Sequence, residues 1–283
     1  MNKDLVLSNG EKIPALAYGT WLIPNDIAAE CVKNALEAGY RHIDTAQAYG
    51  NEVGVGEGIR LSGIKREDIY VTTKVMAEFK TYDEARISME DSLKRLGLDY
   101  VDLILIHCPQ PWREFRGVKR YFEENIQVWK ALEEFYLAGK AKAIGISNFL
   151  VDDIENITNN CSIKPMVNQI LCHIGSTPVD VIKYCQENGI VVEAYSPMGH
   201  GRILDNEPIL KMAEKYGVSV AQLCIKYTLQ IGTVSIPKAK SKQHIIEDTK
   251  LDFEISQEDM VELMKLNDVD YGEDAFWPVF RQK

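Results

Sequence analysis

The sequence has no long apolar run, and its basic residues are outnumbered by its acidic ones. No stretch approaches the ~18 consecutive apolar residues of a membrane-spanning helix, so we expect no membrane association. The 42 Asp and Glu against 32 Lys and Arg give a net charge of −10. Because nucleic acids and anionic membrane surfaces are bound by basic faces, this balance argues against either as a partner.

Cysteine occurs, but never in a pattern typical of a metal site or a disulfide framework. The six cysteines are scattered, and none forms Cys-x-x-Cys or pairs with His at zinc spacing, so we expect no metal. Reduced thiols in a reducing compartment are the simplest interpretation. The opening stretch MNKDLVLSNGEKIPAL also lacks the apolar core of a signal peptide, so the expected location is the cytoplasm.

The sequence does contain enough apolar material for one large core. Its 283 residues are 46% hydrophobic and 26% charged, as is typical of a globular protein. The length is normal for one α/β barrel. Because no linker or low-complexity tract divides the chain, we expect a single domain over residues 1–283, and a monomer.

Short apolar segments alternate with segments of helical periodicity. We predict eight strands, at residues 15–19, 42–44, 69–74, 101–107, 143–147, 166–169, 191–195 and 233–237. Three- and four-residue apolar spacing predicts helices at residues 26–37, 82–96, 124–137, 178–188, 208–216 and 219–230. Eight such units predict a closed (β/α)8 TIM barrel, with an open doubly wound sheet as the alternative. Before them, Asn9-Gly10 between two β-prone runs predicts a type I′ hairpin.

Polar side chains follow the predicted strands, where barrel enzymes carry their active sites. A single polar residue after a strand is most often an ordinary turn residue. One barrel, however, brings all its strand ends to the same mouth, and this set includes a carboxylate, an amine and an imidazole. The strand ends carry Asp44, Lys74, His107, Ser147, Asn148, Gln169, Tyr195 and Lys238.

Tyr49 lies five residues after Asp44, in the stretch YRHIDTAQAYGNE. A phenol with a pKa of ~10 is a poor acid at neutral pH, but a neighbouring cation lowers its pKa. We expect Lys74 to be that cation and Asp44 to hold it in place. Tyr49 would then protonate an oxygen that becomes negative, while neutral His107 orients that oxygen. A carbonyl that accepts hydride forms such an oxygen, and only a cofactor can donate the hydride.

The chain resembles the aldo-keto reductase family over nearly its full length. The motifs that carry the resemblance are, in order, GYRHIDTAQAYGNE, VTTKV, LILIHCP, GISNF, VNQI, EAYSP and SIPKAKSKQHIIED. The resemblance implies a (β/α)8 barrel whose N-terminal hairpin closes the bottom. It implies that Asp44, Tyr49, Lys74 and His107 are catalytic, with Tyr49 the acid. It also implies reversible reduction of small aldehydes or ketones to alcohols with NADPH, and no metal.

The resemblance further implies which residues bind the cofactor. Tyr195 matches the tyrosine that stacks on nicotinamide, and Lys238 matches the lysine that binds the 2′-phosphate. The residues that hydrogen-bond the carboxamide correspond to Ser147, Asn148 and Gln169. Other cofactor contacts are implied for Gly19, Thr20, Ser196, Met198, His244, Glu247 and Asp248.

Two positions beside Lys238 depart from the family pattern. Ala239 replaces a frequent Ser, and His244 replaces a frequent Arg. Histidine stacks on adenine and forks onto phosphate less well than Arg. Lys240 and Lys242 add positive charge in the run KAKSK. We therefore expect NADPH/NADP, with NADH as the open alternative.

Trp21 and Trp112 are the candidate walls of the substrate pocket. Trp21 follows the first strand, where the family places an aromatic wall, and Trp112 lies five residues past His107. The alternative for Trp112 is a loop aromatic packed on the barrel rim. Residues 267–283 are rich in aromatics and are expected to cover one end of the barrel.

Three other interpretations of the sequence are less favoured. The stretch GVGEG lacks the third glycine of a dinucleotide-binding loop, which favours glycines on a helix surface. Lys74 could form a Schiff base as in barrel aldolases, but a neighbouring carboxylate raises a lysine's pKa and disfavours this. A nicotinamide-binding regulatory subunit with slow turnover is the remaining alternative, and the complete set of candidate catalytic residues argues against it.

Overall fold

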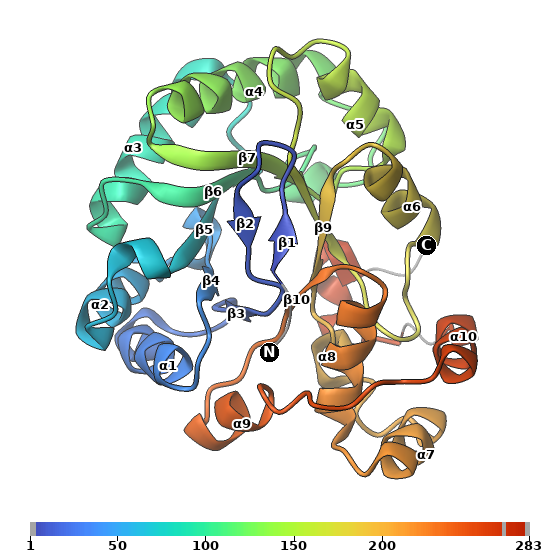
Figure 1. Cartoon of the computed structure of the whole chain (residues 1–283). Coiled ribbons are helices and arrows are strands. Elements are labelled where there is room, and N and C mark those ends of the chain that lie inside the picture. Colours follow the sequence, from blue (N-terminus) through green and yellow to red (C-terminus); the bar gives the residue numbers. More distant parts are fainter. Residues whose placement is uncertain (1–3, 268–269, 281–283) are drawn as a thin grey trace.

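Eight parallel strands lie side by side in the order in which they occur along the chain (Figure 1). This computed structural model describes residues 4–267 and 270–280. Two hydrogen bonds of 2.8 Å join the last strand segment to the first, from Ser235 N to Ala15 O and from Gly19 N to Pro237 O. The strands are β3 (Ala17–Gly19), β4 (His42–Asp44), β5 (Tyr70–Val75), β6 (Val101–Ile106), β7 (Ala141–Ser147), β8 (Val167–Leu171), β9 (Val191–Tyr195) and β10 (Val234–Ile236). The (β/α)8 barrel is confirmed, and the open doubly wound sheet is wrong.

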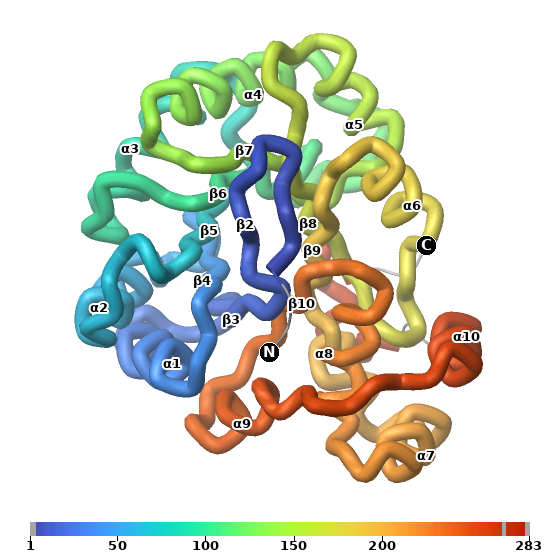
Figure 2. The backbone as a smooth tube through the Cα atoms, viewed as in Figure 1, coloured from blue at the N-terminus to red at the C-terminus, as the bar shows by residue number. Residues whose placement is uncertain are grey.

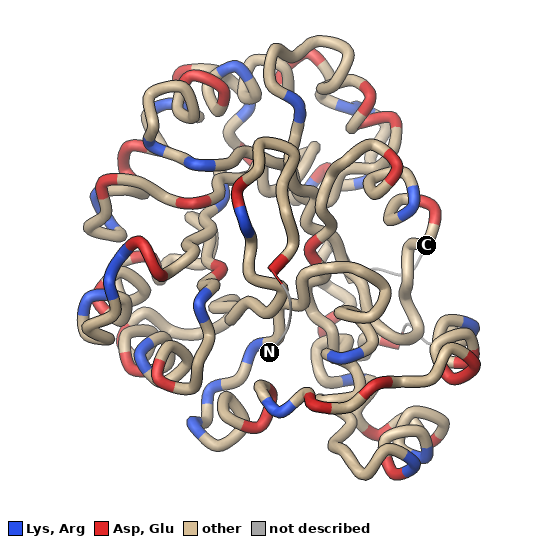
Figure 3. The backbone as a smooth tube through the Cα atoms, viewed as in Figure 1, with Lys and Arg blue, Asp and Glu red and all other residues tan. Residues whose placement is uncertain are grey.

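Both faces of the strands are covered. Every residue of β5 and β6 is buried, since one face packs inside the barrel and the other under the helices. The helices form a ring outside the strands (Figure 2). Acidic and basic residues are interspersed along these helices (Figure 3).

All the predicted helices are present, with ends within two residues of the predicted bounds. They are α1 (Asn25–Glu37), α3 (Tyr82–Leu96), α4 (Phe122–Leu137), α6 (Val179–Glu187), α7 (Glu207–Tyr216) and α8 (Val220–Gln230). Local signals explain such agreement: α3 begins at a capping box formed by Thr81 and Glu84, and ends at Gly97 with a φ of 65°. The prediction missed α2 (Glu52–Ser62), α5 (Val151–Thr158), α9 (Lys242–Glu247) and α10 (Gln257–Lys265).

The glycines of α2 are buried between helices. A Cβ on Gly56 would lie 1.9 Å from the carbonyl oxygen of Leu96, and one on Gly58 would lie 2.7 Å from that of Ala29. The stretch GVGEG is therefore helical rather than a dinucleotide loop. The expectation that these glycines lie on the helix surface is wrong, because they let the backbone of α2 approach α1 and the end of α3.

An antiparallel hairpin of β1 (Leu5–Val6) and β2 (Lys12–Ile13) lies across one end of the barrel (Figure 1). Asn9 Nδ2 donates to the carbonyl oxygen of Lys142, near the start of β7, so this end is the amino end of the strands. The predicted type I′ turn is wrong. Gly10 has a φ of 89°, but Asn9 has no positive φ, because its Oδ1 instead accepts from Glu11 N in a wider loop.

Candidate active site

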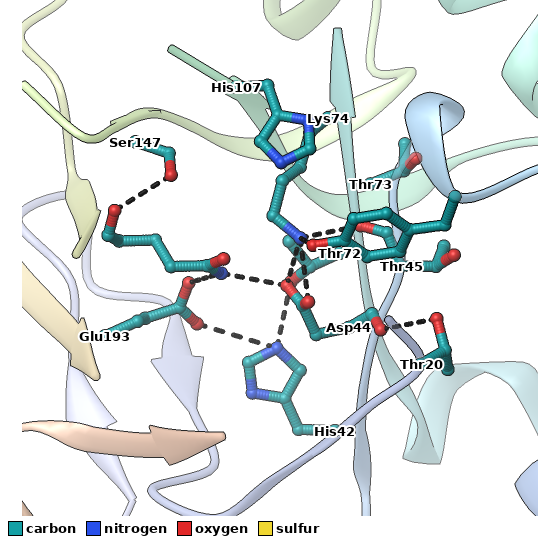
Figure 4. A network of polar contacts seen from close by, with 12 residues as sticks. Thr20, His42, Asp44, Thr45, Thr72, Thr73, Lys74, His107, Ser147 and Glu193 are labelled. Carbon is teal, nitrogen blue, oxygen red and sulfur yellow. Dashed lines mark hydrogen bonds and ion pairs between the residues drawn. The ribbon is translucent and has the colours of Figure 1, made fainter. Parts of the chain in front are cut away.

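The carboxyl ends of β4 and β5 join Asp44 and Lys74 in a buried ion pair (Figure 4). Lys74 Nζ lies 2.7 and 2.8 Å from the two Asp44 oxygens and 2.8 Å from the carbonyl oxygen of Thr45. Its fourth neighbour is the hydroxyl of Tyr49, at 3.3 Å. The short 3₁₀ turn Gln47–Tyr49, which ends at Gly50 with a φ of 68°, presents that phenol. The structure thus brings three of the predicted catalytic residues into direct contact.

The pKa of Tyr49 shifts in the direction opposite to our prediction. Burial, reinforced by the Asp44 carboxylate, raises this pKa well above its ordinary value. The prediction considered the Lys74 cation alone, but Asp44 offsets that charge and the buried phenolate loses its hydration. Tyr49 therefore stays protonated at neutral pH, and gives up its proton only to a strong base.

His107 follows β6 and packs between two aromatic rings. Its ring centroid lies 5.6 Å from that of Tyr49 and 5.0 Å from that of Trp112. Burial, with help from the Lys74 charge, lowers the pKa of His107 well below its usual range, so the imidazole is neutral. Its Nδ1 is buried and has no hydrogen-bond partner among the described residues. A neutral imidazole keeps one N–H to donate.

The ends of β7 and β9 form a second polar group beside this cluster. The Tyr195 hydroxyl donates to Asn148 Oδ1 at 2.7 Å, and Asn148 Nδ2 donates to the carbonyl oxygen of His107 at 3.0 Å. Ser147 Oγ donates to the carbonyl oxygen of Gln169 at 2.8 Å. Asn148 and Ser196 have positive φ angles of 63° and 52°, a costly conformation for these residue types that is common at functional sites.

Glu193 is a site residue that sequence reasoning missed. It is fully buried inside the barrel, and its Oε2 accepts a 2.8 Å hydrogen bond from Gln169 Nε2. Burial and the nearby Asp44 raise the pKa of Glu193 to about 8. The signal was present in the sequence, because an acidic residue interrupts the apolar strand VVEAY.

One continuous cavity of about 1440 Å³ connects these groups. Tyr49 and His107 line it, and so do the candidate walls Trp21 and Trp112. Thr20, expected to touch the cofactor, instead lies behind the wall, where its hydroxyl donates to the carbonyl oxygen of Asp44 at 3.0 Å. The other predicted cofactor residues also line the cavity, namely Gly19, Ser147, Asn148, Gln169, Tyr195, Ser196, Met198, Lys238, His244, Glu247 and Asp248.

Lys238 supplies an unpaired cation on the cavity wall. Its ammonium makes no hydrogen bond or ion pair with any residue in 4–267 or 270–280. Burial and the neighbouring Lys240 lower the pKa of Lys238, which is the signature of an amine without an anion. Lys242, by contrast, binds Glu37 of α1 at 2.9 Å. An unpaired lysine on a cavity this long fits a phosphate-bearing dinucleotide.

The described part of the C-terminal stretch contributes residues 276–280 to the wall of the cavity. Residues 268–269 and 281–283 lie outside the described residues. Trp21 packs against Trp277 and Phe280, each with its ring centroid at 5.7 Å. Asp274 fastens the stretch, because its Oδ2 lies 2.5 Å from Nδ1 of His200 on the loop after β9. His200 lines the cavity, whereas His173 is buried and hydrogen-bonded to Tyr271.

Two features are absent from the described residues, 4–267 and 270–280. No group of three or more His, Cys, Asp or Glu side chains there could hold a metal ion. No helix there is long and apolar enough to cross a membrane.

A closed barrel with a buried lysine–carboxylate pair, a phenol and an imidazole at its carboxyl end, beside a long cavity, has the architecture of a barrel enzyme. The sequence model of the Aldo/keto reductase family matches residues 15–268. The chain belongs to this family, and it is an oxidoreductase.

Individual relatives agree with this assignment. Glyoxal reductase of Bacillus subtilis is 44% identical over 94% of this chain and 93% of the relative. An aldehyde reductase of Saccharomyces cerevisiae is 37% identical over 94% of this chain and 91% of its own length. The crystal structure of a Bombyx mori aldo-keto reductase in complex with NADP superposes with a TM-score of 0.86, at 32% identity, over 100% of this chain and 99% of that one.

Proposed function

We propose that this protein reduces small aldehydes or ketones to alcohols with NADPH, and that Tyr49 is the acid. The observation that carries the proposal is the position of Lys74 Nζ, which contacts both the Asp44 carboxylate and the Tyr49 hydroxyl. The glyoxal and aldehyde reductases among the relatives support a small carbonyl substrate. The aromatic walls Trp21 and Trp112 suit such a substrate's apolar part.

Each side chain has a distinct part in the proposed reaction. A bound reduced nicotinamide supplies the hydride that reaches the carbonyl carbon. The Tyr49 hydroxyl donates its proton to the carbonyl oxygen as that oxygen gains negative charge. Lys74, 3.3 Å from the phenol oxygen, stabilises the phenolate left behind, and Asp44 fixes Lys74. Neutral His107 donates a hydrogen bond that orients the carbonyl oxygen.

The raised pKa of Tyr49 is compatible with this role. A phenol that stays protonated until an alkoxide forms delivers its proton only when hydride arrives. Proton transfer to such a strong base remains favourable even from a weak acid. The buried Lys74 ammonium acts on the phenolate after transfer rather than on the resting phenol.

Residues on the cavity wall are proposed to hold the cofactor. Tyr195 offers a ring for stacking on the nicotinamide, and Ser147 and Asn148 offer polar groups for its carboxamide. Lys238 is proposed to bind the 2′-phosphate, because it is a cation without a partner among the described residues. The NADP bound to the silkworm relative supports this choice.

Substitution Tyr49→Phe tests the reaction. Without the acid, kcat for glyoxal, methylglyoxal and benzaldehyde should fall by about 10²–10⁴-fold, the usual size of a general-acid contribution. The NADPH dissociation constant should stay within about threefold, because the phenol hydroxyl is not proposed to bind the cofactor. Tyr184→Phe, which removes a hydroxyl on the outer helix α6, is the matched control.

A Tyr49→Phe variant that keeps most of its turnover would contradict the mechanism. Wild-type protein that binds NADPH but turns over no aldehyde in a broad panel would favour the regulatory-subunit alternative.

Fluorescence titration with NADPH and, separately, with NADH tests the cofactor. Tighter binding of NADPH by about tenfold would correspond to ~1.4 kcal/mol from the 2′-phosphate. Equal binding of the two cofactors would mean that Lys238 does not contact that phosphate.

A further inference from the structure

Glu193 has no part in the reaction proposed above, but it is hydrogen-bonded to Gln169, which in turn is hydrogen-bonded to Asp44. Its position on β9 is paired in register with Gln169 on β8. Gln169 Nε2 lies 2.8 Å from Glu193 Oε2 and 2.8 Å from Asp44 Oδ2. Both hydrogens of one amide group are therefore shared between two buried carboxyls. Figure 4 shows His42 on the opposite side of Asp44 from His107, and Glu193 to the left of Asp44.

The surroundings of Glu193 favour a neutral carboxyl. His42 Nδ1 lies 3.3 Å from the carbonyl oxygen of Pro14, which can only accept, so the ring proton is on Nδ1. His42 Nε2 is then an acceptor, which takes a 2.9 Å hydrogen bond from the Thr72 hydroxyl and lies 3.7 Å from Glu193 Oε1. Burial lowers the pKa of His42 to about 3, so no cation faces Glu193 from β4.

The remaining titratable groups around Glu193 also favour a neutral Glu193 carboxyl. Asp44 on β4 is an anion that pairs with Lys74, and Tyr70 on β5 is a neutral phenol whose pKa is raised well above its ordinary value by burial and by Glu193. If Glu193 were also an anion, the only cation near it in the described part of the chain would be Lys74, which already pairs with Asp44. The pKa of Glu193, raised to about 8, is consistent with a protonated carboxyl at neutral pH.

This arrangement fixes the orientation of the Gln169 side chain. A primary amide is planar, so when both N–H groups face the two carboxyls the carbonyl oxygen must point away from them. Gln169 lines the cavity, and its Oε1 makes no hydrogen bond with another residue of the described chain. An unpaired acceptor is thereby held at the cavity wall.

We propose that Glu193 is a positioning residue: by accepting one N–H of Gln169 it orients the amide, so that the other N–H holds Asp44 and the carbonyl oxygen accepts from the carboxamide of a bound nicotinamide. This inference rests on the proposed function, since it assumes that the cavity binds the cofactor. The family resemblance implies only that Gln169 binds the carboxamide. The present inference adds that Glu193, on β9, sets the orientation of the Gln169 amide.

Two substitutions of similar size separate the hydrogen bond from packing. Glu193→Leu removes the acceptor, so Gln169 loses one of two partners and its amide can rotate. We expect the NADPH dissociation constant to rise by about tenfold, the size of one lost buried hydrogen bond, and kcat to fall as Asp44 loosens. KM for the aldehyde should change by less than about threefold, because its walls are untouched.

Glu193→Gln is the matched variant, because its side-chain oxygen can still accept from Gln169 while its charge is always zero. It should recover most of the NADPH affinity that Glu193→Leu loses. Cofactor affinity is measured by fluorescence quenching without aldehyde, and thermal unfolding shows that each variant is folded.

The outcomes are distinguishable. A folded Glu193→Leu variant with wild-type affinity and kcat would overturn the inference. Equal loss in the Leu and Gln variants would also overturn it, since a carboxyl rather than an acceptor would then be required. Wild-type protein that binds no NADPH would instead refute the proposed function, independently of either variant.

Discussion

At the scale of single residues, the buried ion pair is stable because Asp44 and Lys74 satisfy each other. Lys74 is fully buried, and its ammonium group is hydrogen-bonded to four oxygens. These are both Asp44 carboxylate oxygens, the Thr45 carbonyl oxygen and the Tyr49 hydroxyl. A buried charge left without its partner typically costs about 3–5 kcal/mol. The site therefore depends on the pair being kept intact, and the same burial keeps Tyr49 and His107 neutral.

Asp248 gives a prediction about pH. Burial, reinforced by Glu247 and opposed by His244, raises the pKa of Asp248 to about 7. The folded pKa thus exceeds the unfolded value of ~3.9, so the folded state binds the proton more tightly and stability falls as pH rises from about 4 to 7. Asp248→Asn removes the ionisation, and should raise Tm at pH 8 but not at pH 4.

The gain at pH 8 is at most ~4 kcal/mol, which corresponds to about three pKa units. Thermal unfolding of both proteins at the two pH values measures it. Asp252→Asn, which alters an exposed carboxylate nearby, is the control. An equal rise in Tm at pH 4 and pH 8 would contradict the assigned protonation.

At the scale of elements, the strands fix the Asp44–Lys74 ion pair, a 3₁₀ turn presents Tyr49, and the loops shape the access to these groups. Asp44 and Lys74 belong to β4 and β5, whose register is set by hydrogen bonds to neighbours on both sides. The walls around them come from less regular segments, namely the loop after β9 and the 3₁₀ turns Gly272–Phe276 and Pro278–Phe280. The buried ion pair and these walls thus lie on different kinds of element.

The contact between Asp274 and His200 gives a prediction about substrate size. Asp274 Oδ2 also lies 3.6 Å from Arg202 Nε, so Asp274→Asn weakens two charged contacts of the C-terminal stretch. We expect KM for benzaldehyde to rise by about fivefold, whereas KM for glyoxal changes by less than twofold, because only the larger substrate needs the wall of Trp277 and Phe280.

Steady-state kinetics with both aldehydes checks this prediction. Glu273→Gln, the exposed neighbour, removes the same charge without the contact and serves as the control. An equal change of KM for the two aldehydes would show that Asp274 does not act through the aromatic wall.

At the scale of the whole molecule, the barrel is expected to unfold as one unit. The hydrogen bonds that join the β10 and β3 segments close the eight-stranded sheet, so within the described residues this sheet has no free edge at which its strands could separate. The cavity is lined by residues from Gly19 to Phe280, so a ligand bound there contacts both ends of the chain. Ligand binding should therefore stabilise the entire fold.

NADPH at one hundred times its dissociation constant should add about 2.7 kcal/mol of stability. For a chain of this size that corresponds to a rise in Tm of roughly 4–5 °C, visible by scanning calorimetry. NADH at the same concentration should raise Tm less. Two transitions, of which only one moves with NADPH, would contradict the prediction of a single domain.

The sequence by itself determined the repeating architecture and indicated the groups that we propose to react. Apolar spacing and helix-ending glycines are local signals, so all eight strands and the longer helices were predicted close to their observed bounds. The short helices α5 and α9 were missed because they span too few turns for periodicity, and α2 because its glycines obscure the pattern. Asp44, Tyr49, Lys74 and His107 were recognisable because the motifs around them are also local.

Only the tertiary structure determined the protonation and the hydrogen bonding of these groups. The pKa of Tyr49 depends on the sum of burial, Lys74 and Asp44, and not on any one neighbour. The bond from Gln169 to Asp44 joins positions 125 residues apart. The role inferred for Glu193 exists only because β4, β8 and β9 bring Asp44, Gln169 and Glu193 to one point. Charge and hydrogen bonding in a buried site depend on the distances between strands, and those distances are set by closure of the barrel rather than by any local stretch of sequence.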